Sequence, residues 1–121
     1  MREIVFRGKR RDGVWVEGYY FAKPILEKHF IELGEEQWMV DPSTVGQYTG
    51  LTDKNGKRIF EGDIVRIYKT LFVTEWRGAE FVFGHINGQP WSYPYFASHA
   101  ESCEVIGTIH DNPELLKEET T

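Results

Sequence analysis

Glycine and proline cut this chain into short segments that favour compact β-structure over long helices. Twelve glycines and five prolines are spread over the 121 residues, and 15% of the residues are aromatic. The segments between the glycines and prolines are rich in valine, isoleucine and aromatic side chains, which suit a pleated, half-buried surface. The pattern therefore predicts a mainly β fold. A chain of this length corresponds to one domain with a hydrophobic core of its own.

The first half of the chain predicts antiparallel strands joined by tight turns. Asp12-Gly13 marks the turn of an opening hairpin. The segment Asp41–Thr44 is expected to reverse the chain again, because Asp41 can accept hydrogen bonds and Pro42 has a fixed φ. Residues 23–34 fit either a helix or a loop followed by a strand, and the loop followed by a strand is favoured. The strands expected in this half are 4–7, 15–21, 29–33 and 37–40.

The second half predicts a meander that ends in a short helix. Asn55-Gly56 is expected to reverse the chain between two short strands, and Asp63 to hydrogen-bond to turn amides beside Gly62. The aromatic segment 91–96 contains a proline, so it belongs at a sheet edge or in an ordered loop. Pro113 is suited to the first position of a helix. The expected strands are 64–69, 71–76, 80–86 and 103–110, followed by a helix over 113–119.

Charge and cysteine content narrow the classes of protein that this sequence fits. The net charge is −5, which disfavours a generic nucleic-acid or membrane-surface binder, because those depend on a large basic field. Residues 1–11 nevertheless carry a net charge of +4 and the remainder −9. An anion-binding patch is therefore expected at the N-terminal end.

Cys103 is alone, so no intrachain disulfide can form, and the composition suits a reducing cytoplasm. No run approaches the roughly 20 apolar residues that cross a bilayer. Neither secretion nor membrane spanning is expected.

One run of sequence resembles a known family. Residues Val40–Arg66, VDPSTVGQYTGLTDKNGKRIFEGDIVR, closely resemble the signature of the YopX family of phage and prophage proteins. Phe6–Lys9 and Glu104–Asn112 agree with the same pattern. The resemblance implies a phage or prophage origin, expression in a bacterial cytoplasm, and an all-β architecture with a small SH3-like barrel. It implies no catalytic residues, because the family has no established biochemical function.

With this resemblance the chain is expected to be a single YopX-like domain. An N-terminal β subregion would span residues 1–49, the SH3-like barrel 50–110, and a helical turn and tail 111–121. The signature itself indicates architecture, because its glycines mark tight turns.

The usual constellations of catalytic and metal-binding residues are weak in this sequence. His99, Cys103 and His110 are metal-ligand types, but a structural zinc site normally takes four ligands, often in Cys-x-x-Cys pairs. Cys103 lies on an apolar segment, so it is expected to be a small buried side chain and not a nucleophile. No metal, no cofactor and no catalytic residue is predicted.

Two groups of residues are candidates for binding a partner. Clustered cations between the first strands could contact a nucleic-acid backbone, although a solvated hairpin turn is the simpler interpretation. A third alternative is contact with an acidic partner or with the chain's own acidic tail, Glu114, Glu118 and Glu119. An aromatic group could form a groove for a partner or an interface between copies of the chain, although filling the core is the simpler role. The candidate nucleic-acid-binding residues are Arg7, Lys9, Arg10 and Arg11, and the candidate partner-binding residues are Trp91, Tyr93 and Tyr95.

The sequence therefore favours a phage or prophage accessory protein without enzymatic activity, which binds a host or phage macromolecule. Nucleic-acid binding through the basic hairpin 7–11 is the alternative, and an enzyme with an unrecognised site comes last. The partner and the oligomeric state are not specified by the residues.

Overall fold

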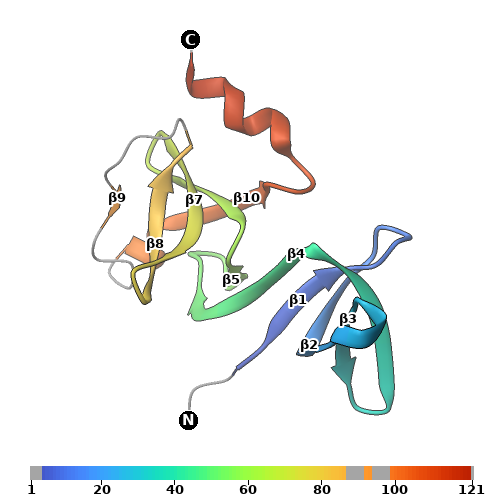
Figure 1. The fold of residues 1–121 in the computed structure, drawn as a ribbon. Coiled ribbons are helices and arrows are strands. Elements are labelled where there is room, and N and C mark those ends of the chain that lie inside the picture. The colour runs from blue at the N-terminus through green and yellow to red at the C-terminus, as the bar shows by residue number, and fades with distance from the viewer. Residues whose placement is uncertain (1–3, 87–91, 94–98, 121) are drawn as a thin grey trace. The chain divides into compact units, whose positions relative to one another are not determined.

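The structure is a computed structural model that describes residues 4–86, 92–93 and 99–120 (Figure 1). The chain is mainly β, as predicted, and divides into two compact units, Met1–Tyr48 and Thr49–Thr121. The strands are β1 (Phe6–Lys9), β2 (Trp15–Lys23), β3 (Lys28–Leu33), β4 (Glu36–Thr52), β5 (Arg58–Phe60), β6 (Asp63–Ile67), β7 (Thr70–Arg77), β8 (Glu80–His85), β9 (Ser92–Tyr93) and β10 (Cys103–Thr108), with 3-10 helices η1 (Pro24–Leu26) and η2 (Pro113–Thr120).

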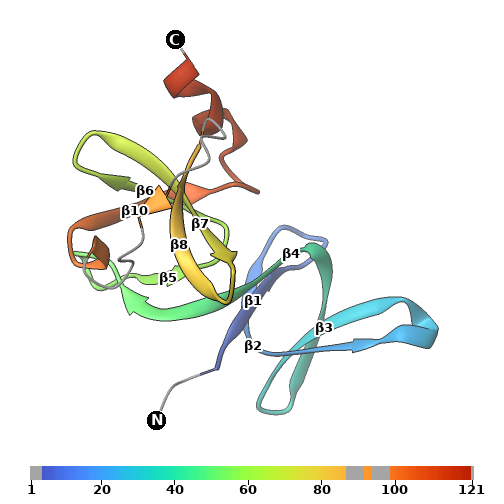
Figure 2. The ribbon, with the colours of Figure 1, turned by 60° about the vertical axis from the view of Figure 1, so that its left-hand side comes forward.

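Antiparallel pairing links the first four strands in chain order. β1 pairs with β2, β2 with β3 and β3 with β4, and β1 also pairs with β4. β2 and β3 run side by side up to η1, which connects them (Figure 2). Of the two alternatives for residues 23–34, the loop followed by a strand is confirmed, because helix is limited to the single turn Pro24–Leu26.

The core of the first unit lies on one face of these strands. Val16, Ile31 and Val40 form its buried centre, and partly buried aromatic and aliphatic side chains pack around them. Gly18 allows β2 to approach β3 here. A Cβ at this position would clash with the carbonyl oxygen of Glu32 and lie 3.3 Å from Cγ2 of Ile31. The close approach of two backbones thus requires glycine at residue 18.

The expected reversal at Asp41–Thr44 is wrong, because β4 runs through it without a break. The side-chain hydrogen bond expected for a turn does form, but it accompanies an irregularity in the strand. Arg7 lies opposite Gly46, whereas Lys9 lies opposite Asp41, so the β1–β4 register shifts between them. Asp41 Oδ1 accepts a hydrogen bond from the Ser43 N–H at 2.9 Å. The Asx-type hydrogen bond that suggested a turn therefore bends a strand instead.

The second unit contains a five-stranded antiparallel sheet in the order β10-β6-β7-β8-β9. Within the described ranges no pairing joins β9 to β10, so the structure describes an open sheet and the SH3-like barrel remains a prediction. The β6–β7–β8 meander confirms the strands expected at 64–69, 71–76 and 80–86 to within two residues at each end. Ser92 and Tyr93 pair with β8 at the edge of the sheet, as expected for this aromatic segment.

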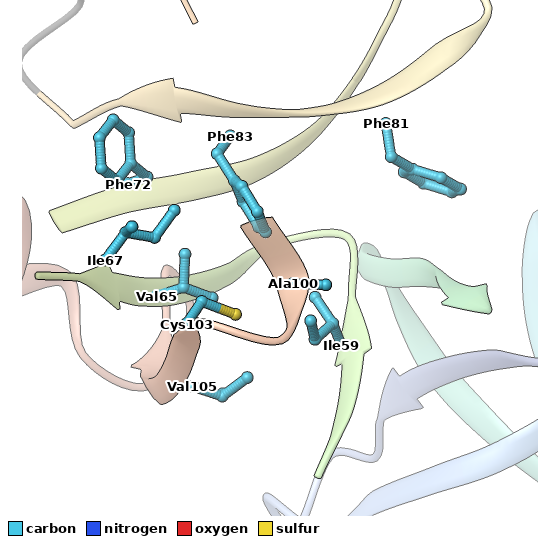
Figure 3. Packing of buried hydrophobic residues seen from close by; sticks show 9 residues of the cluster. All are labelled: Ile59, Val65, Ile67, Phe72, Phe81, Phe83, Ala100, Cys103 and Val105. Atoms are coloured by element: carbon cyan, nitrogen blue, oxygen red, sulfur yellow. The ribbon is translucent and has the colours of Figure 1, made fainter. Parts of the chain in front are cut away.

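Apolar side chains of this sheet, together with Ile59 of β5 and Ala100, form the second core (Figure 3). Phe72 and Phe83 are almost fully buried, and Cys103 is fully buried among them. Burial of each such side chain contributes on the order of 2 kcal/mol.

Two aspartates of the sequence signature hold turns in the second unit. The carboxylate of Asp53 is 5% exposed and accepts hydrogen bonds from the N–H groups of Asn55 (2.8 Å), Lys57 (2.9 Å) and Val105 (2.9 Å). Asp63 Oδ2 accepts a hydrogen bond from the Phe60 N–H at 2.7 Å, which confirms its expected role in a turn. These contacts support the architectural interpretation of the signature.

Besides the helical residues His99 and Ala100, the described helices are the 3-10 helices η1 and η2. Neither is long or apolar enough to reach across a lipid bilayer.

Candidate functional site

A concave, basic surface lies in the first unit, between the β1–β2 turn, the start of β3 and the irregular part of β4. This basic hollow has a volume of about 740 Å³, which is within the usual range for ligand sites of roughly 300–1,000 Å³. Four of its residues are cationic and one is acidic. Its lining consists of Lys9, Arg10, Arg11, Lys28, Met39, Val40, Asp41, Pro42 and Thr44.

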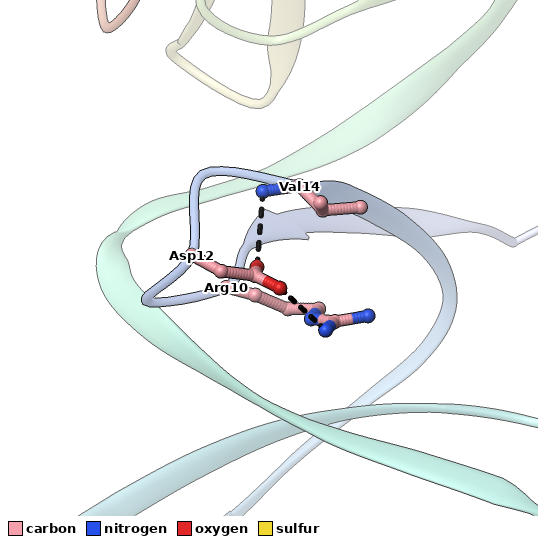
Figure 4. Close-up of polar contacts among 3 residues, drawn as sticks. All are labelled: Arg10, Asp12 and Val14. Atoms are coloured by element: carbon pink, nitrogen blue, oxygen red, sulfur yellow. Dashed lines mark hydrogen bonds and ion pairs between the residues drawn. The ribbon is translucent and has the colours of Figure 1, made fainter.

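The β1–β2 turn positions Arg10 and Arg11 at the hollow. Asp12 Oδ1 accepts a hydrogen bond from the Val14 N–H at 3.2 Å, and Asp12 Oδ2 forms an ion pair with Arg10 Nη2 at 2.6 Å (Figure 4). The same aspartate therefore closes the turn and orients a guanidinium. The turn predicted at Asp12-Gly13 is confirmed, with Gly13 at φ +88° donating its N–H to the Arg10 carbonyl at 2.9 Å.

The irregular part of β4 forms the opposite side of the hollow. Thr44 is buried, and its hydroxyl donates to the Asp41 carbonyl at 2.6 Å while accepting from the Lys9 N–H at 2.8 Å. This hydroxyl thus connects β1 to the bulged segment. The apolar surface of Met39, Val40 and Pro42 is consequently held next to the cations.

Arg7 is not part of the exposed loop in which the sequence placed it. It lies on β1, is only 9% exposed, and has its guanidinium carbon 4.6 Å from the centre of the Trp15 ring. Lys9 Nζ lies 5.8 Å from the same ring. Cation–π contacts of this kind are worth about 0.5–2 kcal/mol. Arg7 therefore has a structural position beneath the surface, whereas Lys9, Arg10 and Arg11 line the hollow.

The structure describes only one of the three aromatic residues that were predicted to bind a partner. Trp91 and Tyr95 lie outside the described residues. Tyr93 lies in β9, where its backbone pairs with that of Phe83. Partner binding by these three residues stays a prediction.

Cys103 is in the core and not at a surface site. Burial, together with the nearby charge of Asp53, raises the pKa of its thiol to about 11. A thiol with such a pKa is protonated at neutral pH and is a poor nucleophile. Over residues 4–86, 92–93 and 99–120, no three histidine, cysteine or acidic side chains gather as they would around a metal ion.

Sequence reasoning missed Lys28, Met39 and Pro42 as parts of this site. The register of β3 with its neighbours brings Lys28 opposite Lys23 and Met39 opposite Phe30. The sequence signalled this site only through the cations clustered near its N-terminus. The contribution of β3 and β4 depended on strand pairing, which a single sequence does not specify.

The hollow has the composition of an anion-binding surface. Its lysine and arginine side chains supply several hydrogen-bond donors, and apolar side chains line the same surface. Asp41 is the one acidic residue in the lining. The first unit as a whole carries seven basic and eight acidic residues, so the cations are concentrated locally and the unit is nearly neutral. Any attraction of this unit for anions would therefore come from the local cluster of cations and not from the field of the whole unit.

Comparison with known proteins gives a family and a fold. The family model described as YopX protein matches residues 11–117. None of the curated proteins matches the chain. The crystal structure of protein EF1440 from Enterococcus faecalis is similar to this chain with a TM-score of 0.60 and 21% identity, covering 96% of this chain and 99% of that one. At that identity the similarity concerns the fold alone.

Proposed function

The chain belongs to the YopX family, whose function is unknown, and on that premise we propose that it is a non-enzymatic binding module for an anionic macromolecule. The basic hollow carries this proposal. Four cations and an apolar floor converge on a surface large enough to hold several groups of an extended ligand.

The burial and protonation of Cys103, the strongest nucleophile in the chain, favour binding over catalysis as the function. Cys103 is buried and its pKa is raised to about 11, so it supports core packing and not covalent chemistry. The acidic residue of the hollow, Asp41, is engaged by Ser43, whose N–H and hydroxyl both donate to its Oδ1. This carboxylate supports the bend in β4.

The cellular setting is part of the proposal. The sequence signature resembles phage and prophage proteins, and the single cysteine suits a reducing compartment. The module would thus act in the cytoplasm of a bacterial host, as an accessory protein that binds a host or phage macromolecule. Nucleic acid and an acidic protein are both polyanions of this kind.

A binding experiment with three polyanions tests the proposal. Fluorescence anisotropy would measure binding of labelled heparin, an oligonucleotide and a poly-glutamate peptide. We expect at least one to bind, and we expect affinity to fall about 20- to 150-fold between 50 and 200 mM salt if three or four anionic groups are neutralised.

Charge-matched variants locate the binding surface. Arg11→Gln combined with Lys28→Gln removes two cations of the hollow, whereas Lys54→Gln combined with Lys69→Gln removes two exposed cations of the second unit. The first pair should abolish most of the binding and the second should change it little. Absence of binding to all three polyanions at low salt would contradict the proposed function.

A further inference from the structure

We infer that the anionic macromolecule is a single-stranded nucleic acid, whose bases stack on an aromatic sheet face while its phosphates occupy the basic hollow. This inference rests on the proposed function and specifies its ligand. The observation behind it is that a row of exposed and partly exposed aromatic side chains continues directly into the cationic site.

The aromatic face is defined by strand register. Phe21 on β2 lies opposite Phe30 on β3, and Phe30 lies opposite Met39 on β4. Tyr19 is two residues from Phe21, so these four side chains project from one face of the three strands. We call this surface the aromatic face.

Solvent reaches this surface. Tyr19 is 68% exposed and Met39 is 51% exposed, while Phe21 and Phe30 are partly exposed. The rings of Phe21 and Phe30 stack with centroids 5.3 Å apart and planes 15° from parallel. The core residues Val16, Ile31 and Val40 alternate with them along the strands and form the other face. The aromatic face is therefore not needed to fill this core.

Two residues connect the aromatic face with the basic hollow. Met39 belongs to both, and Lys28, two residues before Phe30, lines the hollow. Lys23 lies opposite Lys28, and its Nζ is 5.2 Å from the Phe30 ring. Cations thus lie at one end of the stacked aromatic pair. A positive groove beside exposed rings is the arrangement by which proteins hold single strands, with phosphates on the cations and bases on the rings.

The opposite end of the aromatic face is acidic, so the two ends of this surface differ in charge. Glu32 lies opposite Tyr19, and its Oε1 accepts a hydrogen bond from Gln37 Nε2 at 3.0 Å. A carboxylate repels phosphate but accepts hydrogen bonds from base amino groups. Phosphates are consequently favoured at the Lys28 end, and bases at the Tyr19 end.

A single strand fits this charge pattern better than the two other polyanions. In a duplex the bases are stacked inside, so Tyr19 and the phenylalanines would have no base to contact. A poly-glutamate peptide would use the cations but has no aromatic base to stack on the rings. The aromatic face therefore distinguishes single strands from both.

The test compares ligands and variants in one titration series. Wild-type protein is titrated into a labelled single-stranded DNA of about 12 nucleotides, its RNA counterpart, the same sequence as a duplex, and the poly-glutamate peptide. Tyr19→Ala removes an exposed ring, and Ile25→Ala, at a residue that is 99% exposed, is its control. We expect single strands to bind most tightly, with Tyr19→Ala lowering their affinity about 5-fold or more and Ile25→Ala having no effect.

A second measurement reports stacking directly. An oligonucleotide carrying 2-aminopurine should show quenched fluorescence on binding wild-type protein, and less quenching with Tyr19→Ala. Phe30→Leu should also reduce the quenching, provided that circular dichroism shows this variant to be folded. Tyr19→Ala tests the inference whether or not Phe30→Leu folds.

The outcomes separate the two proposals. If duplex or peptide binds as tightly as the single strands, or if Tyr19→Ala leaves single-strand affinity unchanged, this inference is overturned and the anionic-ligand proposal stands. If none of the polyanions binds at low salt, both are overturned. A preference between DNA and RNA would identify which single strand is bound.

Discussion

The carboxylate of Asp53 accepts a hydrogen bond from the backbone N–H of Val105 at 2.9 Å, across 52 residues of sequence. The same side chain accepts hydrogen bonds from Asn55 and Lys57 in its own turn. One buried acid thus joins the Asn55-Gly56 turn to β10. Both segments belong to the sequence patterns that resemble the YopX family, so a contact of the fold accounts for part of that resemblance.

Replacing Asp53 by asparagine should destabilise the protein. The amide has one acceptor oxygen and places an NH₂ group against at least one N–H donor, so the buried set of hydrogen bonds cannot be completed. We expect a loss of about 2 kcal/mol in the free energy of unfolding, measured by urea titration. Glu101→Gln, an exposed acid of the same unit, is the control and should change stability by less than about 0.5 kcal/mol.

The stability of the wild-type protein should fall in acid partly because of Asp53. Burial alone would raise the pKa of this carboxyl. Hydrogen bonds from the Val105, Lys57 and Asn55 backbone, with the charge of Lys57, outweigh burial and lower the pKa below its ordinary 3.8.

A lowered pKa means that the stabilisation is complete above pH 3.8 and is lost as pH falls through the folded-state value. The difference in urea midpoint between wild type and Asp53→Asn should therefore be constant from about pH 7 to 5 and shrink below about pH 4. A difference that grows on acidification would contradict the assignment.

Gly18→Ala should weaken the β2–β3 pairing. The added methyl group would meet the carbonyl oxygen of Glu32, which is backbone and cannot move aside without displacing the strand. We expect a loss of about 1–3 kcal/mol in the free energy of unfolding. Glu17→Ala, at the exposed neighbouring residue, provides the comparison. Equal stability of both variants would show that the strands have room to separate.

Thr44→Val tests the link between β1 and the irregular part of β4. Valine keeps the shape but removes the hydroxyl that accepts from Lys9 and donates to Asp41. Loss of this pair should cost about 1–3 kcal/mol of stability and speed amide hydrogen exchange at Lys9. Ser43→Ala removes an exposed hydroxyl next to it and should have a smaller effect.

Short-range turn preferences in this chain could be predicted from the sequence. Whether each preference reversed the chain or only bent a strand could not. Asp12-Gly13 and Asn55-Gly56 specified turns because positive φ and side-chain acceptors act within a few residues. Asp41 presented the same local signal, but pairing with β1 and β3 kept the chain extended and converted the turn into a bulge. Tertiary pairing overrode a correct local preference.

The sequence predicted that the candidate site would be basic, but it did not predict the full set of residues that line it. Three of the four predicted cations line the hollow, because they lie next to one another in the β1–β2 turn. Arg7 does not, because it is almost fully buried and its guanidinium packs over the Trp15 ring. Lys28 and Met39 reach the site through strand register, which depends on long-range pairing.

The burial of Cys103 has a practical consequence for spectroscopy. The chain has one cysteine, and its sulfur is enclosed in the core in its protonated form. A cysteine introduced on the surface, such as Tyr68→Cys, would be the one thiol available to a maleimide dye in the folded protein. Single-site fluorescent labels can therefore be attached in the natural sequence background, without first removing the native sulfhydryl.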